Sequence, residues 1–234
     1  ITGFKMQNID ALLNDLKHAE SESLIWLWNT HIHGNTPIIE KKNNTDTYFA
    51  YFFWQGEDNT ENVYLHCGVT GDKLTKLDRI ADSNYFVYKM ELPGELRTLY
   101  SFLPNLDKTL IPDTDINDPA ALSEINNLLR PLFKPDPSNQ MRQVLYDGDE
   151  KTYSVKSIIE MPHAEPQPWS LLEPRVPVGT VDPYTIKSKI LKQDRKIWIY
   201  KPCSYDSKSK YGLLLQFDGQ CHQLPSIPLP TILD

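Results

Sequence analysis

The segment Tyr211-Gly-Leu-Leu-Leu-Gln-Phe-Asp-Gly-Gln-Cys-His222 is an apolar run that ends on Asp218-Gly219, close to the last residue of the chain, Asp234. An unbroken apolar run is typical of a strand that is buried on both faces, and such strands belong to sheets that helices cover on each side. The residues after His222 include three prolines and no helical pattern. We therefore expect one whole domain followed by the first strands of a second, incomplete domain.

The residues before this segment predict a helical start and then an antiparallel β-sandwich. Asn8 is a suitable cap for a helix whose apolar residues from Ile9 to Leu16 recur at intervals of three and four, and a second helix is expected from Ser21 to His31. Short strands separated by turn residues follow, which is the pattern of a sandwich. They are expected at Tyr48 to Trp54, Val63 to Val69, Phe86 to Leu92, Leu99 to Leu103 and Tyr153 to Met161. Apolar residues alternate with residues expected to be exposed in two of them, at Val63, Leu65, Cys67 and Val69 and at Phe86, Tyr88, Met90 and Leu92.

An acidic insertion interrupts the sandwich between residues 105 and 150, where nine Asp and Glu stand against four Lys and Arg. Asp118-Pro119 is a good helix start, and this helix is expected to end near Pro131. The insertion is either a solvated loop or an acidic binding surface. A proline-rich stretch then predicts a linker, so the expected domains are a sandwich at 1–165, a linker at 166–183 and a second domain at 184–234.

The second domain is expected to open with two antiparallel strands. Ile186, Ser188 and Ile190 alternate, a turn is expected at Lys192 to Asp194, and a strand follows from Lys196 to Tyr200. Two such strands leading into the apolar run at Leu213 are how an α/β-hydrolase sheet commonly begins.

Composition excludes several classes of protein. A net charge of −7 argues against a general nucleic-acid binder, which needs a basic surface. No apolar stretch approaches the roughly 20 residues of a membrane span, so no membrane partner is expected. The three cysteines have no CxxC spacing, which favours a reducing compartment or incidental thiols.

The sequence lacks most of the patterns that mark catalytic and metal-binding residues. No two glycines are four residues apart, so the G-x-S-x-G turn that carries a hydrolase serine is missing and any such nucleophile lies outside this chain. His31 and His33 have no Cys, Asp or Glu in ligand spacing, so no metal is expected. Cys221-His222 is best explained as an ordinary loop thiol beside a histidine, because catalytic partners usually meet in space rather than in sequence.

Asp218-Gly219-Gln220 is the strongest candidate site. In α/β-hydrolases the loop after the third strand supplies a backbone N–H to the oxyanion hole, and a glycine there allows close approach to the substrate. A simple Asp-Gly turn at the end of a strand is the alternative, and the residues alone do not decide between the two.

Several motifs resemble the enterochelin (ferric enterobactin) esterases. In the C-terminal part these are Gln167-Pro168-Trp169, Arg195-Lys-Ile-Trp-Ile-Tyr-Lys-Pro202 and Leu213-Leu-Leu-Gln-Phe-Asp-Gly-Gln220. Motifs similar to the N-terminal domain of that family are Gly34-Asn-Thr-Pro-Ile-Ile39, Tyr48 to Trp54, Asp136-Pro-Ser-Asn139 and Ser154 to Pro162. They follow in order along nearly the whole chain. Ser138 is a small departure, since many members have Leu there.

The resemblance implies an immunoglobulin-like sandwich joined to an α/β-hydrolase that cleaves the ester backbone of a ferric catecholate siderophore and releases iron in the cytoplasm, without a cofactor. It places the backbone N–H of Gly219 or Gln220 in the oxyanion hole, and Arg195, Trp169 and Asp218 at the substrate. The catalytic serine, acid and histidine fall on no residue of this chain. The chain alone is therefore expected to be inactive.

The charge distribution and the aromatic residues agree with this expectation, but each also has another explanation. Residues 184 to 211 contain eight Lys and Arg against two Asp, which suits a trianionic substrate, although lysines that guard a solvated strand edge explain it as well. Trp54 and Trp169 could stack on catechol rings or pack in a core. The alternative function is a non-catalytic sandwich module that binds carbohydrate or protein.

Overall fold

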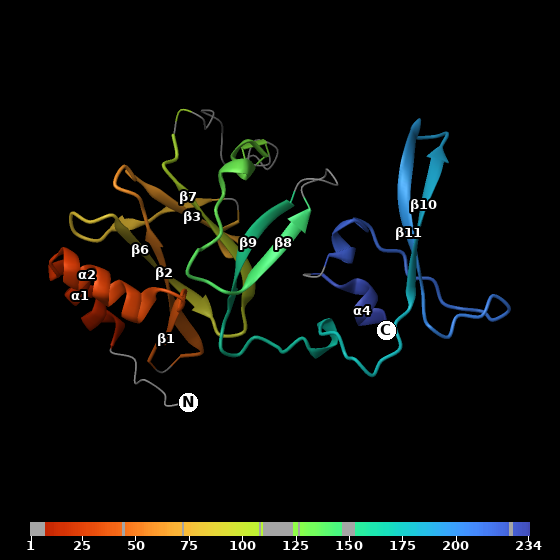
Figure 1. Ribbon diagram of the computed structural model, residues 1–234, viewed down its shortest axis with the longest axis horizontal. Helices are drawn as coiled ribbons and strands as arrows, with labels where there is room; N and C mark the ends of the chain where they lie inside the picture. Colours follow the sequence, from red (N-terminus) through yellow and green to blue (C-terminus); the bar gives the residue numbers. More distant parts are fainter. Residues whose placement is uncertain are drawn as a thin grey trace. The chain divides into compact units, whose positions relative to one another are not determined.

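The computed structural model describes residues 8–43, 45–71, 73–107, 109, 124–125, 127–146, 153–224 and 227–234. The chain divides into two compact units (Figure 1). The first comprises Ile1–Gln143 with Ser154–Ala164, and the second comprises Val144–Tyr153 with Glu165–Asp234.

Two helices open the first unit. α1 (Ile9–His18) begins at Asn8, whose side chain accepts a hydrogen bond of 2.9 Å from the N–H of Asp10, so the predicted cap is confirmed. α2 (Ser21–Leu27) continues as the π-helix η1 (Trp28–Ile32), so the second predicted helix is α-helical in its first part and π-helical in its last. The buried side chains of these helices form one apolar cluster with the outer face of the first sheet.

Two antiparallel sheets form the body of this unit, although residues 144–146 and Tyr153, at the edge of the second sheet, are grouped with the second unit. The first sheet has the order β1-β2-β6-β5, and the second has the order β4-β3-β7-β9-β8. The strands are β1 (Ile38–Lys41), β2 (Thr47–Gln55), β3 (Val63–Cys67), β4 (Leu74–Lys76), β5 (Asp78–Arg79), β6 (Tyr85–Pro93), β7 (Arg97–Pro104), β8 (Arg142–Tyr146) and β9 (Tyr153–Glu160). The predicted mainly β class with N-terminal helices is confirmed.

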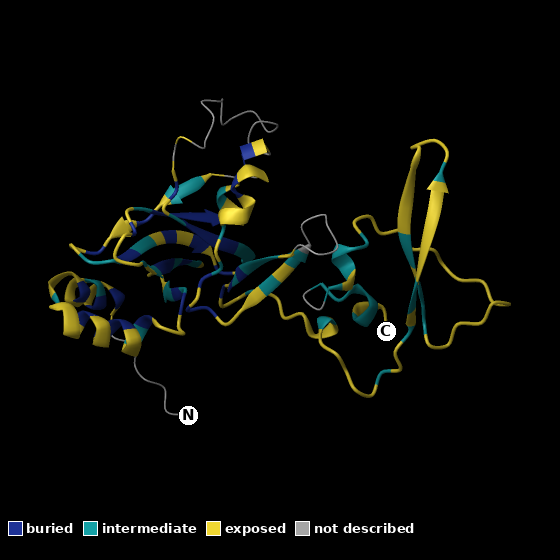
Figure 2. Ribbon diagram, turned by 45° about the horizontal axis from the view of Figure 1, so that its top comes forward, coloured by how far each residue is buried: buried dark blue, intermediate teal, exposed yellow. Residues whose placement is uncertain are grey.

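Strand β2 is buried on both faces, which explains its dense aromatic sequence. Ala50 and Phe52 face the second sheet, where the ring of Phe52 packs edge-on against Tyr100 with centroids 5.0 Å apart. Tyr51 and Phe53 face the helices instead. Figure 2 shows the buried residues of this unit concentrated in its sheets.

Strand β3 differs from the expected alternation of buried and exposed residues, because all five of its residues are buried. The insertion supplies the reason. Ile125 and Leu129 pack with Tyr64 on the outer face of the second sheet, and the 3₁₀ turn η4 (Arg130–Leu132) follows them. The described end of the insertion is therefore part of the core, whereas the predicted helix start at Asp118-Pro119 lies outside the described residues.

The second unit consists of a long hairpin and short helical turns. β10 (Thr180–Ser188) pairs with β11 (Gln193–Lys201). The turns are η5 (Pro168–Ser170), η6 (Cys221–Gln223) and α4 (Leu229–Leu233). The predicted turn at Lys192 to Asp194 is displaced, since strand pairing resumes at Gln193 opposite Ser188.

The predicted buried strand at Leu213 to Phe217 is wrong. These residues have no regular secondary structure, and the side chains of Leu213 and Phe217 are 92% and 75% exposed. An apolar run becomes a buried strand only where neighbouring strands pair with it and helices cover it. Within the described residues the sheet of this unit has two strands, β10 and β11, and neither pairs with the run. No helix among the described residues is both long and apolar enough to cross a membrane.

Candidate functional site

A tight turn carries the predicted oxyanion residues. Asp218 adopts a left-handed conformation with φ of 56°, and the N–H of Cys221 donates to its carbonyl oxygen at 2.8 Å. Gly219 lies directly over the indole of Trp198 from β11, where an added Cβ would stand 3.2 Å from Cε3. The turn can approach this ring so closely because residue 219 has no side chain.

Two backbone donors of this turn remain available. In the part of the chain that the structure describes, neither the N–H of Gly219 nor that of Gln220 meets an acceptor. The side chain of Gln223 donates to the carbonyl oxygen of Gly219 at 3.1 Å, and Gln216 Nε2 lies 2.9 Å from Nε2 of His222. The turn is thus held from both sides while its adjacent N–H groups can bind an anionic oxygen.

Of the remaining predicted substrate residues, Asp218 belongs to the turn itself, whereas Arg195 and Trp169 are not brought to it by any side-chain contact among the described residues. Arg195 is exposed on β11 and pairs across the hairpin with Ile186. The side chain of Asp218 is also exposed. Trp54, the other aromatic candidate, packs against Phe102 with centroids 5.1 Å apart and belongs to the sandwich core.

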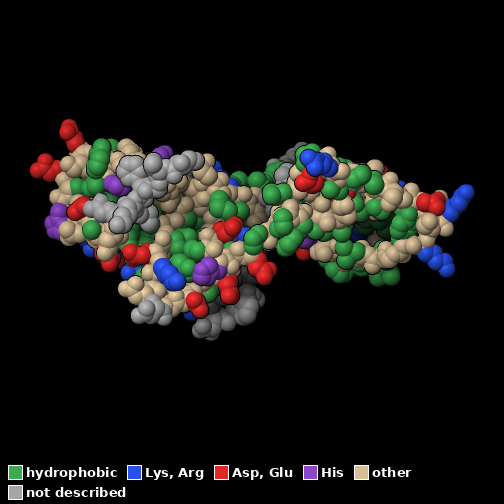
Figure 3. Space-filling view, turned by 90° about the horizontal axis from the view of Figure 1, so that it is seen from below, with side chains coloured by type: hydrophobic (Ala, Val, Ile, Leu, Met, Phe, Trp, Pro, Cys, Tyr) green, Lys and Arg blue, Asp and Glu red, His purple; other side chains and the backbone are tan. Residues whose placement is uncertain are grey.

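Trp169 lines a shallow groove of about 190 Å³ within the second unit. Trp169 is 54% exposed, and its neighbours in the groove are mainly aliphatic. The charged residues that line the groove are Glu173 and Asp234, both acidic. Figure 3 shows hydrophobic side chains gathered over this unit. An acidic, apolar groove is electrostatically unsuited to a trianionic catecholate, although it leaves the aromatic face of Trp169 accessible.

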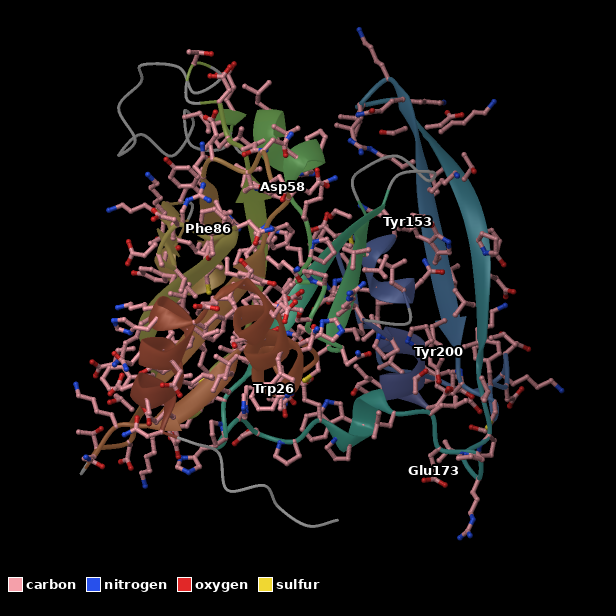
Figure 4. All side chains as sticks on the ribbon, turned by 60° about the vertical axis from the view of Figure 1, so that its left-hand side comes forward. Trp26, Asp58, Phe86, Tyr153, Glu173 and Tyr200 are labelled. Carbon is pink, nitrogen blue, oxygen red and sulfur yellow. The ribbon has the colours of Figure 1, made fainter. Side chains whose placement is uncertain are left out.

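Asp234 has a structural role beside this groove. Its Oδ1 accepts hydrogen bonds from the hydroxyl of Tyr200 at 2.9 Å and from the N–H of Gly179 at 2.7 Å. Tyr200 projects from β11 toward α4 (Figure 4). Burial and the adjacent Asp234 carboxylate raise the pKa of Tyr200 to about 12. These bonds fasten the end of α4 to the hairpin.

A buried polar network surrounds Asp136, in a motif for which the sequence predicted no such role. Asp136 is fully buried, and Oδ2 accepts from the hydroxyls of Thr36 and Tyr100, each at 2.7 Å. Oδ1 accepts from the N–H of Ser138 at 2.8 Å. Burial raises the pKa of the Asp136 carboxyl, and hydrogen bonds from Tyr100 and Thr36 oppose that rise.

Asn139 extends the network to a second strand. Its Nδ2 donates to the Tyr100 hydroxyl at 2.9 Å and to the carbonyl of Ile158 at 2.8 Å. Burial, followed by the Asp136 charge, raises the pKa of Tyr100. The Asp136-Pro-Ser-Asn139 motif therefore joins β7, β9 and the segment before β1. The only sequence signal for this role is the Asp-x-Ser spacing of a side-chain turn.

The histidine pair does not form a metal site in the described residues. The ring of His31 packs edge-on against Trp26 with centroids 5.9 Å apart, while Nδ1 of His33 lies 3.5 Å from the Ser138 hydroxyl. No group of three or more His, Cys, Asp or Glu side chains that could hold a metal is found where the structure describes the chain.

The family model for the N-terminal domain of enterochelin esterase matches residues 50–170, just over half of the chain. The chain belongs to the enterochelin esterase family. The match covers the sandwich from the middle of β2 onward and extends to η5, whereas β1 and the N-terminal helices precede it. No curated protein matches the chain.

Solved enterochelin esterases share this fold. The crystal structure of enterochelin esterase from Shigella flexneri is 22% identical, with a TM-score of 0.54, and the match covers 93% of this chain and 53% of that one. Ferric enterobactin esterase from Salmonella typhimurium is 23% identical with a TM-score of 0.55, covering 74% and 45%. The Shigella flexneri enterobactin esterase solved in the presence of enterobactin is 23% identical with a TM-score of 0.51, covering 77% and 45%. The chain thus spans about half the length of these enterochelin esterases.

Proposed function

We propose that this chain is the N-terminal portion of a cytoplasmic siderophore esterase that hydrolyses the ester bonds of a ferric catecholate and so releases its iron. The observation that carries the proposal is the match of residues 50–170 to the enterochelin esterase N-terminal domain. The solved relatives support the substrate class, because one of them was crystallised in the presence of enterobactin and another in the presence of 2,3-dihydroxy-N-benzoyl-serine.

In this proposal the turn at Gly219 acts on the ester carbonyl. When a nucleophile attacks an ester, negative charge develops on the carbonyl oxygen, and preorganised N–H donors lower the energy of that state. The N–H groups of Gly219 and Gln220 are adjacent and without an acceptor among the described residues. The G-x-S-x-G nucleophile would belong to a hydrolase domain outside these 234 residues.

The proposed substrate contacts are of two kinds. Arg195 would offer a cation to the anionic catecholate, and its exposed position leaves the guanidinium free to do so. Trp169 would offer an aromatic face, provided that the substrate ring enters the groove edge-on and keeps its charge away from Glu173. The exposed side chain of Asp218 would lie beside the substrate at the edge of the turn.

The test is Gly219→Ala in the full-length enzyme. The new Cβ would stand 3.2 Å from the Trp198 ring, so either the ring or the turn must shift by a few tenths of an ångström. We expect the turn to shift, which would move its two N–H groups out of line with the ester. Losing one oxyanion donor costs about 100- to 1000-fold in kcat, and we expect KM to change much less. Gly212→Ala is the matched control, because nothing lies within 4 Å of a Cβ there.

A second variant separates the donor from general damage to the fold. Trp198→Leu removes ring atoms that crowd residue 219, so combining it with Gly219→Ala should restore part of the lost turnover. Turnover equal to the wild-type enzyme in a folded Gly219→Ala variant would show that Asp218-Gly219 is merely a turn.

A further inference from the structure

The closed end of the β10–β11 hairpin combines exposed aliphatic side chains with several exposed lysine and arginine side chains. A four-residue turn, 189–192, joins Ser188 to Gln193, and the hydroxyl of Ser188 accepts from the N–H of Leu191 at 3.1 Å. At the apex the side chain of Ile190 is 93% exposed and that of Leu191 is 53% exposed. Figures 1 and 2 show this end of the hairpin extending beyond the other elements of its unit, with its residues coloured as exposed.

Positive charge surrounds this apex in a protein whose net charge is −7. Between residues 187 and 196 there are five Lys and Arg and a single acid, Asp194. Within the described part of the chain, Lys187, Lys189, Lys192 and Arg195 form no ion pair. All four side chains are exposed. The cations are therefore available to a partner rather than committed to the fold.

The turn contains a left-handed residue. Lys192 has φ of 53°, which closes the turn, and Lys189 and Lys192 flank the aliphatic pair in the sequence. The N–H of Leu191 donates to the Ser188 hydroxyl, which ties the apex to the end of β10. A hairpin end of this kind is narrow and convex.

The shape and chemistry of the apex favour one class of partner. A stable protein partner needs about 800 Å² of surface from each side, which a convex turn of four residues does not offer. A nucleic acid would use the cations but gains nothing from a protruding isoleucine. An anionic lipid surface uses both, because aliphatic side chains enter the boundary of the acyl chains while lysine and arginine stay at the level of the headgroups.

We propose that the closed end of the β10–β11 hairpin, residues 187–196, docks onto membranes that contain anionic phospholipids, with Ile190 and Leu191 inserted and Lys187, Lys189, Lys192 and Arg195 at the headgroups. This contact is peripheral, so it needs no membrane-spanning helix. It shares Arg195 with the esterase proposal but does not depend on that proposal, because neither the Gly219 turn nor turnover enters it and the test replaces Lys189, Lys192 and Ile190 only.

The experiment is flotation of the purified chain with vesicles of mixed phosphatidylglycerol and phosphatidylcholine, compared with vesicles of phosphatidylcholine alone. We expect binding to the mixed vesicles only, falling as salt is raised because the screening length shrinks from about 10 Å at 0.1 M to about 3 Å at 1 M. Lys189→Gln with Lys192→Asn should weaken binding about 25-fold, or about fivefold for each charge. Ile190→Ser should weaken it about tenfold.

Two control variants make the same kinds of substitution outside the hairpin. Lys208→Gln with Lys210→Gln removes the same charge from the loop that follows β11, and Leu213→Ser replaces a leucine that is 92% exposed, close to the 93% of Ile190. Both should bind the mixed vesicles like the wild-type chain. Three outcomes would each overturn the proposal. The first is an equal loss of binding in the controls, and the second is no flotation with the mixed vesicles. The third is binding of the chain to RNA that is unchanged in the Ile190→Ser variant.

Discussion

Replacing Asp136 by alanine tests the buried network most directly. The change removes the acceptor of two hydroxyls and one backbone N–H, from Thr36, Tyr100 and Ser138. Asp136, Tyr100 and Ser138 are each at most 5% exposed, so water does not readily replace the lost acceptor. The buried donors would be left partly or wholly unsatisfied.

The magnitude follows from these three bonds. A buried polar group that loses its partner costs about 1–3 kcal/mol, and Asp136→Ala removes the partner of three such groups. We therefore expect Asp136→Ala to lower the free energy of unfolding of the first unit by about 4 kcal/mol, a large part of the roughly 5–15 kcal/mol that holds a typical domain together. The melting temperature should fall by roughly 10 °C.

Differential scanning calorimetry of the 234-residue chain provides the measurement. The matched control is Asp107→Ala, because Asp107 also accepts from a backbone N–H and a hydroxyl, both of Thr109, but is exposed to solvent. That variant should melt close to the wild-type temperature. An Asp136→Ala variant that melts as high as the control would refute the view that this network holds the sandwich together.

Three further outcomes are expected. Burial raises the pKa of Asp136, so its neutral form contributes stability that is present below the unfolded-state pKa of about 4 and is lost as pH rises through the folded-state pKa. The free energy of unfolding of the wild-type chain, measured by urea titration, should therefore exceed that of Asp136→Asn by less as pH rises. A difference that grows with pH would contradict this. Limited proteolysis should cut first between Pro162 and Pro183, whereas a first cut between Tyr48 and Leu103 would oppose the proposed domain boundary. The purified 234-residue chain should not hydrolyse a tri-catecholate lactone, and turnover comparable with a full-length relative would exclude a nucleophile outside it.

The parts of the fold that could be predicted from sequence depend on neighbours along the chain. Asn8 caps α1 as expected, because a helix N-terminus needs only the residues that follow it. The alternation of Phe86, Tyr88, Met90 and Leu92 correctly gave the inner face of β6, since the core contains Phe86, Met90 and Leu92 with Tyr88 packed against it. A helix cap and an alternating strand can therefore be recognised from neighbouring residues alone.

The errors concern features that depend on distant residues. Leu213 to Phe217 has the composition of a buried strand, yet burial is a property of the strands and helices around it. The role of Asp136 depends on Thr36, 100 residues away, and on Tyr100, 36 residues away. Gly219 could be singled out by its place after an apolar run, but its contact with Trp198 depends on how the turn folds back onto β11.

The exposed run from Leu213 to Phe217 also has a consequence for the behaviour of the chain in solution. Leu213, Leu215 and Phe217 are between 72% and 92% exposed, and the run contains no charge and no proline. Short apolar segments of this kind pair readily with copies of themselves and can start fibrils. Lys210 and Asp218 flank the run as charged gatekeepers, which slow such pairing without preventing it at high concentration. The shelf life of this polypeptide should therefore depend on concentration and salt more than on the melting point of its sandwich.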